Sequence, residues 1–175
     1  MEERPRESSI IRIVTKYGIL QGVVWFTVFL VRTLTGVPTS WLETVVEAAP
    51  LVLLMVVTHR EFKKTHDGMM TYPQGLGSGT LLASEAALVT CVLIYIYVSY
   101  INTGYIASAI ELKRAALEQR GITGAQAQQA MAVLSATTTP VGVGVRWLIW
   151  GVILGFIVAL VVSIFTQKGD SRDVI

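Results

Sequence analysis

Residues 147–166 read WLIWGVILGFIVALVVSIFT, a stretch without a single charged side chain. A helix needs about 20 predominantly apolar residues to cross the hydrocarbon core of a bilayer, and this stretch has that length. Three further apolar blocks, residues 17–34, 41–58 and 76–101, come near it. The sequence therefore predicts an all-α membrane protein with four transmembrane helices.

The composition of the chain supports a membrane protein. Of its 175 residues, 53% are hydrophobic and only 15% are charged, whereas a soluble globular chain carries about a quarter charged residues. A net charge of +2 is too small for a nucleic-acid footprint, so we expect no nucleic-acid partner. The single cysteine excludes an intramolecular disulfide. We expect one membrane domain over residues 1–175.

The distribution of basic residues predicts the orientation of the crossings. Nine Lys and Arg side chains precede block 17–34, separate the second block from the third, or follow the fourth, and five lie on the opposite side. The more basic side is the cytoplasmic one under the positive-inside rule, so both termini are expected in the cytoplasm. No A-x-A cleavage pattern follows the first block, which favours a retained helix over a signal peptide.

The connection between the third and fourth blocks is too long for a simple turn. Residues 105–120 are rich in strong helix formers, and Gly121 is a candidate C-cap. Thr123 stands three residues before Gln126, which is the spacing of a capping box. We therefore expect an amphipathic helical hairpin, or one broken helix, over about residues 105–136 on the periplasmic side.

Several stretches of the chain resemble a known family. They are REFK at residues 60–63, Gly68, Tyr72, GLG at residues 75–77 and SIFTQK at residues 163–168, together with the charged helical segment before the last block. Over roughly residues 12–168 the chain is similar to domain of unknown function family 4199, a group of small bacterial inner-membrane proteins. The resemblance implies the four-helix fold and the inner membrane, but no activity and no site residues.

Glu85 is the acidic residue inside the third block. A carboxylate at the centre of a bilayer costs at least about 2.5 kcal/mol. Its neighbours Ala83, Ser84, Ala86 and Ala87 are small, so another helix can approach and Glu85 is expected to face the bundle. Two interpretations stay open, a hydrogen-bonded packing residue and a proton-coupled or ion-binding site.

Charged residues also flank the turn between the first two blocks. Glu43 and Glu47 are four residues apart and share one helix face, and Arg32 lies near the end of the first block. Charges near helix ends in membranes are usually paired. We expect Arg32 to pair with Glu43 or Glu47, with a vestibule for a cationic substrate as the alternative.

Arg60, Lys63 and Lys64 follow the second block and suit contacts with anionic lipid headgroups. His59 and His66 lie in the same stretch, seven residues apart. This is not the spacing of a helical metal motif. We expect neither a metal nor another cofactor.

A ridge of small residues runs along the fourth block at every fourth position: Gly151, Gly155, Ala159 and Ser163. Apolar surface gains nothing from burial inside a lipid bilayer, so helices associate where small side chains let their backbones approach. The ridge therefore predicts a close helix contact. The candidate partners are the first block, the third block or a second subunit.

The sequence contains no recognisable catalytic motif, and Cys91 lies inside an apolar block without a base nearby in sequence. We therefore expect a non-enzymatic accessory or assembly component that acts through helix packing. Its partners would be the lipid bilayer and further copies of itself or other membrane subunits. The alternative is a small oligomeric transporter or ion-coupled carrier that uses Glu85.

Overall fold

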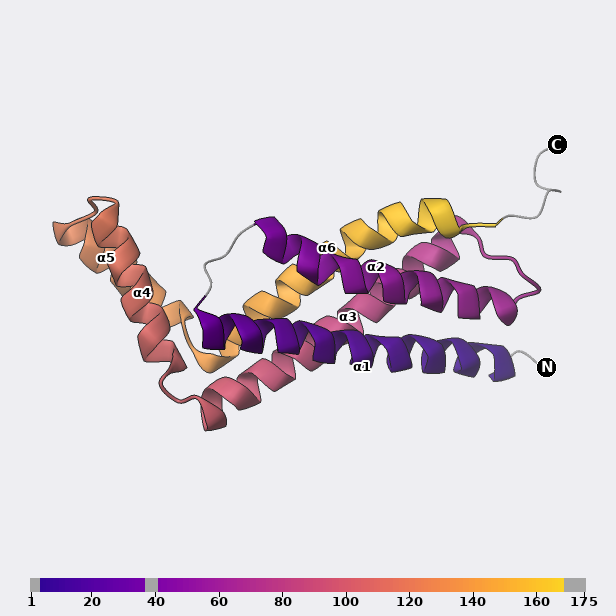
Figure 1. Cartoon of the computed structure of the whole chain (residues 1–175), viewed down its shortest axis with the longest axis horizontal. Coiled ribbons are helices and arrows are strands. Elements are labelled where there is room, and N and C mark those ends of the chain that lie inside the picture. Colours follow the sequence, from indigo (N-terminus) through magenta and orange to yellow (C-terminus); the bar gives the residue numbers. More distant parts are fainter. Residues whose placement is uncertain (1–3, 37–40, 169–175) are drawn as a thin grey trace. The chain divides into compact units, whose positions relative to one another are not determined.

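A computed structural model describes residues 4–36 and 41–168, with side chains described for residues 10–36 and 44–168. Figure 1 shows the helices α1 (Arg4–Thr35), α2 (Trp41–Lys64), α3 (Tyr72–Ile96), α4 (Tyr105–Gln119), α5 (Gly124–Thr137) and α6 (Pro140–Thr166). A π-helical turn, η1 (Tyr97–Ile101), follows α3. Met70 and Lys168 form an isolated backbone bridge, and the described residues contain no strand. The all-α prediction is confirmed for this part of the chain.

The chain divides into two compact units. Unit 1 comprises Met1–Thr90 and Leu148–Ile175, and so contains α1, α2 and most of α3 and α6. Unit 2 comprises Cys91–Trp147, with the end of α3, η1, α4, α5 and the start of α6.

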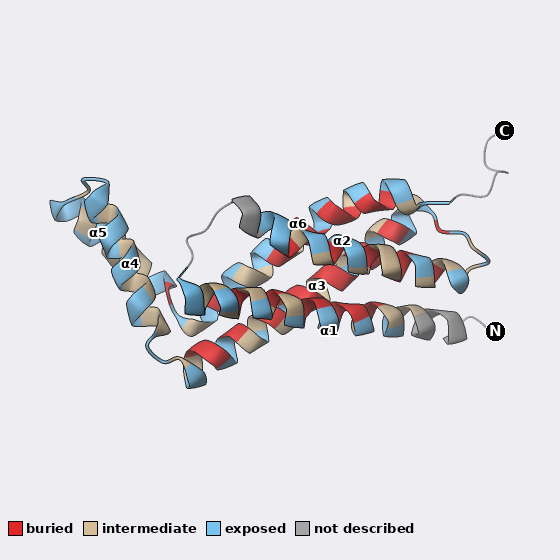
Figure 2. Ribbon diagram, viewed as in Figure 1, coloured by how far each residue is buried: buried red, intermediate tan, exposed pale blue. Residues whose placement is uncertain are grey.

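Four helices pack around one core in unit 1, and glycine contacts give their directions. Gly18 on α1 packs on Leu82 of α3, and Gly22 packs on Ala86, so α1 and α3 run parallel. α6 runs antiparallel to α3, because its residues meet α3 in reverse order. Figure 2 shows buried residues along these helices, and the core that they form includes Trp25 of α1, Leu51 of α2, Leu82 of α3 and Leu154 of α6.

Three helical stretches of the described chain are long and apolar enough to cross a membrane: Ile10–Thr35, Tyr72–Ile101 and Pro140–Thr166. They fit a multi-pass membrane protein. α2 is not among these three, and the crossing expected at 41–58 begins with residues whose side chains lie outside the described ones.

Three of the helices begin earlier than the apolar blocks indicate, and the first of them, α1, begins at Arg4. α3 begins at Tyr72 with Pro73 in its first turn, and α6 begins at Pro140. Proline is well suited to the start of a helix, where its missing N–H costs no intrahelical hydrogen bond. The two prolines therefore mark helix starts that lie before the apolar blocks and cannot be predicted from the length of those blocks. The turn expected at residues 35–40 lies largely outside the described residues.

α2 shows how the chain tolerates a proline and then turns. Pro50 lies inside this helix without ending it. Beyond Lys64 the chain reverses through Asp67 and Gly68, whose φ angles are 52° and 81°. Glycine adopts this left-handed region without a steric penalty. Aspartate is one of the few other residue types that tolerate it.

Unit 2 contains the α4–α5 hairpin. Gly121, with a φ of 72°, follows the end of α4, as expected of a residue that terminates a helix. Thr123 is the N-cap residue of α5, but its side chain makes no capping hydrogen bond, so the capping box is not formed there. Every residue of both helices is described, and none is buried (Figure 2).

Candidate functional site

Glu85 lies where α3 packs against α1. The Thr15 hydroxyl donates a hydrogen bond of 3.0 Å to Glu85 Oε1. A Cβ atom on Gly18 would lie 2.8 Å from Glu85 Oε2, so this oxygen is pressed against the α1 backbone. Oε2 is buried and has no hydrogen-bond partner among the described residues. The side chain therefore faces a neighbouring helix. One of its oxygens is hydrogen-bonded to Thr15, and the other is buried against the α1 backbone.

Gln21 is a second buried polar residue of α1, and the sequence analysis did not single it out. Its side chain is completely buried, and neither its amide oxygen nor its amide nitrogen has a hydrogen-bond partner among the described residues. The only signal in the sequence is a polar residue within an apolar block. A buried polar group without a partner lowers the free energy of unfolding by about 1–3 kcal/mol, so Gln21 is an unfavourable residue in the core.

Glu47 connects three helices of unit 1. Trp25 Nε1 on α1 donates to the backbone oxygen of Glu47 over 3.0 Å. Trp150 Nε1 on α6 donates to Glu47 Oε2 over 2.9 Å. A buried indole N–H normally finds an acceptor, and this general rule was the available clue to the contact of Trp25, which is buried; Trp150 is exposed.

The predicted pairing of Arg32 with Glu43 or Glu47 stays a prediction. Arg32 is half-buried in the last turn of α1. The side chain of Glu43 lies outside the described residues.

His59 is completely buried where α2 meets α3 and α6. Its Nε2 atom lies 3.0 Å from the Gly75 oxygen, and its Nδ1 atom lies 2.7 Å from Thr166 Oγ1. A carbonyl can only accept, so Nε2 carries the hydrogen. The single hydrogen of the Thr166 hydroxyl has two possible acceptors, His59 Nδ1 and the Val162 backbone oxygen at 2.8 Å. Burial lowers the pKa of His59, opposed by the Gly75 carbonyl and reinforced by the charge of Lys63.

His66 does not share this environment. It lies beyond the end of α2, where its ring stacks on Phe62 with 4.2 Å between the ring centroids. Among the described residues, no group of three or more His, Cys, Asp or Glu side chains is arranged to hold a metal ion.

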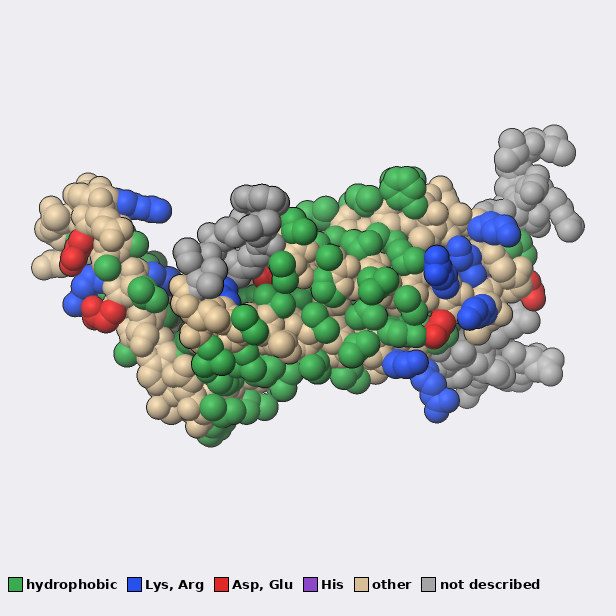
Figure 3. All heavy atoms as spheres, viewed as in Figure 1, with side chains coloured by type: hydrophobic (Ala, Val, Ile, Leu, Met, Phe, Trp, Pro, Cys, Tyr) green, Lys and Arg blue, Asp and Glu red, His purple; other side chains and the backbone are tan. Residues whose placement is uncertain are grey.

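The basic residues after block 41–58 lie at the end of unit 1 where α2 and α6 both end. Arg60 and Lys64 are exposed, and Lys63 is half-buried. Lys63 Nζ donates to the Thr166 backbone oxygen over 2.9 Å, which ties α2 to the last turn of α6. In Figure 3, Lys and Arg side chains gather at this end of unit 1, next to a broad hydrophobic surface.

The small-residue ridge of α6 packs against α3. The four contacts pair Gly151 with Ala87, Gly155 with Ala83, Ala159 with Gly79 and Ser163 with Gly75. A Cβ atom on Gly155 would overlap the Cβ of Ala83, so the helices touch closely there. Each step of four residues along α6 meets a step of four in the opposite direction along α3. The ridge is therefore occupied within the chain.

Two contacts within unit 2 join residues from different parts of the chain. Lys113 Nζ on α4 donates to Thr138 Oγ1, after the end of α5, over 3.3 Å. Burial lowers the pKa of Lys113, and the charge of Arg146 lowers it further. A Cβ atom on Gly144 of α6 would lie 3.0 Å from Sγ of Cys91 on α3, so α3 and α6 approach closely there.

Comparison with known proteins identifies the family of this chain. A family described as "Protein of unknown function (DUF4199)" matches residues 16–168, which is most of the chain. Neither a curated protein nor a solved structure matches the chain. The resemblance found in the sequence is thereby confirmed: this chain, helical and membrane-like in its described residues, belongs to the DUF4199 family.

Proposed function

We propose that this protein is a non-enzymatic accessory or assembly component of the bacterial inner membrane that acts through helix packing. The observation that carries this proposal is the α4–α5 hairpin. Its helices have 15 and 14 residues, all of them described, and none is buried. Helices of this length are marginal in water unless their apolar faces pack on something. The hairpin is therefore suited to a further surface, and we assign that surface to another membrane subunit.

Four crossings are part of this proposal, and the directions of the helices support them. α1 and α3 run parallel, so the chain has to return between them, and α2 makes that return. α6 runs antiparallel to α3 and brings the chain back to the end where α1 begins (Figure 1). In this arrangement both termini are cytoplasmic and the hairpin is periplasmic, in agreement with the positive-inside count.

The polar side chains of unit 1 support a role in packing. Glu85, Glu47 and His59 each form a hydrogen bond to a residue on another helix. Bonds of this kind connect helices inside a membrane, where apolar burial contributes little to their association. We therefore assign these residues to holding the bundle together.

A second candidate function, an ion-coupled carrier, has one observation in its favour. Glu85 Oε2 and the amide of Gln21 are buried without hydrogen-bond partners among the described residues. Ionisable residues within membrane segments often serve ion or proton pathways. Glu85 would then be the group that takes up a proton or a cation, and Gln21 would be a second buried polar group, on α1.

Purification from native membranes tests the accessory role. Leu112 on α4 is 73% exposed, so Leu112→Glu should keep the fold and remove apolar surface from the hairpin. Gln119→Glu, at the exposed end of the same helix, adds the same charge without removing an apolar side chain and serves as the control. A membrane protein should co-purify in fixed ratio with the wild type and with Gln119→Glu, and be lost with Leu112→Glu. The same co-purifying set in all three preparations would refute the proposal.

A further inference from the structure

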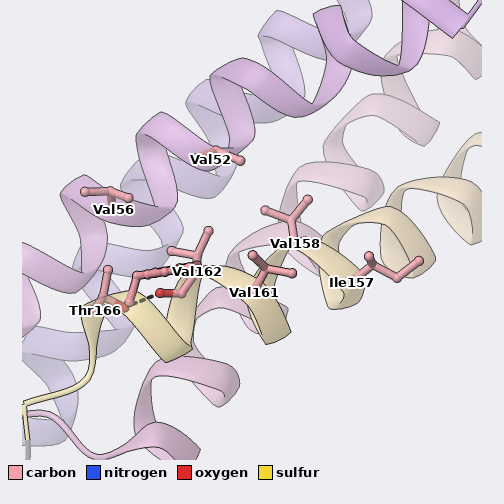
Figure 4. Close-up of a pocket in the computed structure, with 8 residues that line it drawn as sticks. Val52, Val56, Ile157, Val158, Val161, Val162 and Thr166 are labelled. Atoms are coloured by element: carbon pink, nitrogen blue, oxygen red, sulfur yellow. Dashed lines mark hydrogen bonds between the residues drawn. The ribbon is translucent and has the colours of Figure 1, made fainter.

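A groove of about 420 Å³ runs between α2 and α6 on the surface of unit 1. Figure 4 shows valines of α2 facing apolar side chains of α6 across it. Its lining includes Val52 and Val56 from α2 and Ile157, Val161 and Phe165 from α6. The groove ends at Thr166, in the last turn of α6. The surface that lines the groove is apolar, and Thr166 is the one polar residue among those that line it.

We propose that this groove binds an acyl chain of an anionic phospholipid, with the phosphate of that lipid held by Lys63 and its basic neighbours. The inference goes beyond the accessory role and does not depend on a protein partner. It requires only that α2 and α6 lie in the membrane with the Thr166 end at the level of the headgroups.

The basic residues at the end of the groove supply the charge complementarity. Lys63 Nζ lies 2.9 Å from the Thr166 oxygen, so its ammonium group is held beside the end of the groove. An ammonium group has three N–H donors, and the Thr166 carbonyl takes one of them. The remaining donors are suited to a phosphate. Arg60 and Lys64 are exposed in the same turns of α2.

Two acidic residues lie in the same stretch and do not cancel this charge. Glu61 Oε1 accepts a hydrogen bond of 2.6 Å from the Tyr17 hydroxyl, so its carboxylate is directed to α1. Asp67 lies beyond the end of α2, in the turn before α3. Lys168 follows α6 by two residues and adds a further positive charge near Thr166.

The side chains that line the groove favour a lipid chain over another helix. Close docking of a helix requires small residues, and the small ridge of α6 already packs against α3. The groove is lined instead by valine, isoleucine and phenylalanine, which keep a second backbone at a distance. A flexible acyl chain fits between such side chains without a close backbone approach.

The headgroup has to provide the preference between lipids. An acyl chain gains no hydrophobic free energy when it moves from the bilayer into an apolar groove. Basic residues near a membrane surface, in contrast, attract anionic lipids. The groove therefore fixes the position of the lipid, and the charges select its class.

Native mass spectrometry of the full-length protein in a neutral detergent tests this inference. The protein is titrated with phosphatidylglycerol or, for comparison, with phosphatidylcholine. Val161→Trp fills the groove, and Val46→Trp is its matched control, because both valines are 52% exposed and only Val161 lines the groove. Lys63→Gln removes the phosphate contact, and Lys16→Gln removes an exposed charge from α1 as its control.

The wild type, Val46→Trp and Lys16→Gln should retain one phosphatidylglycerol in preference to phosphatidylcholine. Lys63→Gln should weaken that retention about fivefold, as expected for one basic residue, and Val161→Trp should abolish it. Equal retention of the two lipids by the wild type would overturn the inference. Retention by Val161→Trp equal to that by Val46→Trp would overturn it as well, and neither result would affect the test of the hairpin.

Discussion

At the scale of single residues, three polar residues of unit 1, Glu85, Glu47 and His59, contact helices other than their own. Glu85 of α3 accepts a hydrogen bond from α1, and Glu47 of α2 accepts from α1 and α6. His59 of α2 contacts α3 and α6. Hydrogen bonds are directional and strong in a low-dielectric interior, so these residues fix how the helices are rotated against one another.

The buried imidazole of His59 predicts a loss of stability at acidic pH. Because burial lowers the pKa of His59 in the folded protein, the unfolded chain binds the proton first once the pH falls below the ordinary value of 6.5. The contribution of His59 is therefore complete above that pH and declines as the pH falls toward the lowered pKa. Thermal unfolding in detergent should show a lower Tm at pH 5.5 than at pH 7.5.

Two variants assign this pH dependence. His59→Gln should unfold at a lower temperature than the wild type at pH 7.5 but lose much less between pH 7.5 and 5.5. His66→Gln, which alters the half-buried ring stacked on Phe62, should keep the dependence of the wild type. An unchanged pH dependence in His59→Gln would place its origin elsewhere.

A conservative change at Glu85 separates packing from ion coupling. Glu85→Gln keeps an oxygen that can accept the Thr15 hydrogen bond, so the packing interpretation predicts a change in unfolding free energy of less than about 1 kcal/mol. Uptake of protons or cations into reconstituted vesicles should be the same for the wild type and the variant. An uptake that only the wild type shows would instead establish the ion-coupled carrier.

At the scale of elements, the contact between α3 and α6 depends on matched small residues. Gly155 leaves room for no more than the methyl group of Ala83. Gly155→Ala should therefore destabilise the protein by about 1–3 kcal/mol through overpacking. Adding Ala83→Gly to the same chain removes the overlap and should restore most of the lost stability, as measured by thermal unfolding in detergent.

Two controls test whether this effect belongs to the pair. Ala87→Gly combined with Gly155→Ala places the glycine one turn away, opposite Gly151, and should not restore stability. Gly77→Ala should be neutral or slightly stabilising, because a Cβ there meets nothing within 4 Å. Equal rescue by Ala87→Gly would show that the register of α3 and α6 is wrong.

The sequence predicted some features of these elements better than others. Apolar length predicted three of the long helices, but α3 and α6 begin at prolines outside the apolar blocks, where cap chemistry determines the boundary. The spacing of the small residues identified the contact face of α6, yet left its partner open between α1, α3 and another subunit. The partner of this face depends on how all the helices pack together, and the sequence of one block gives no information about that.

The polar contacts were the least predictable part. Tyr17 and Glu61 are 44 positions apart, and His59 and Thr166 are 107 positions apart. Such pairs are formed by the tertiary arrangement and leave no periodic pattern in the sequence. The sequence therefore singled out Glu85 by its cost in a membrane, but not Thr15 as its hydrogen-bond donor.

At the scale of the whole molecule, the chain consists of a helical bundle in unit 1 and a helical hairpin in unit 2. Unit 1 carries helices that run back and forth, closed by polar contacts and by the α3–α6 ridge. Unit 2 carries α4 and α5, fully described and without a buried residue. The bundle is therefore suited to holding the protein in the membrane, and the hairpin to contact with another subunit.

We propose that the chain crosses the membrane four times and that α4–α5 lies on the periplasmic side. Reporters active in only one compartment, fused at Met1, after Gly121 in the α4–α5 connection and at Ile175, test it most directly. We expect a cytoplasmic signal at both termini and a periplasmic signal after Gly121. Termini in opposite compartments, or a cytoplasmic signal after Gly121, would contradict it.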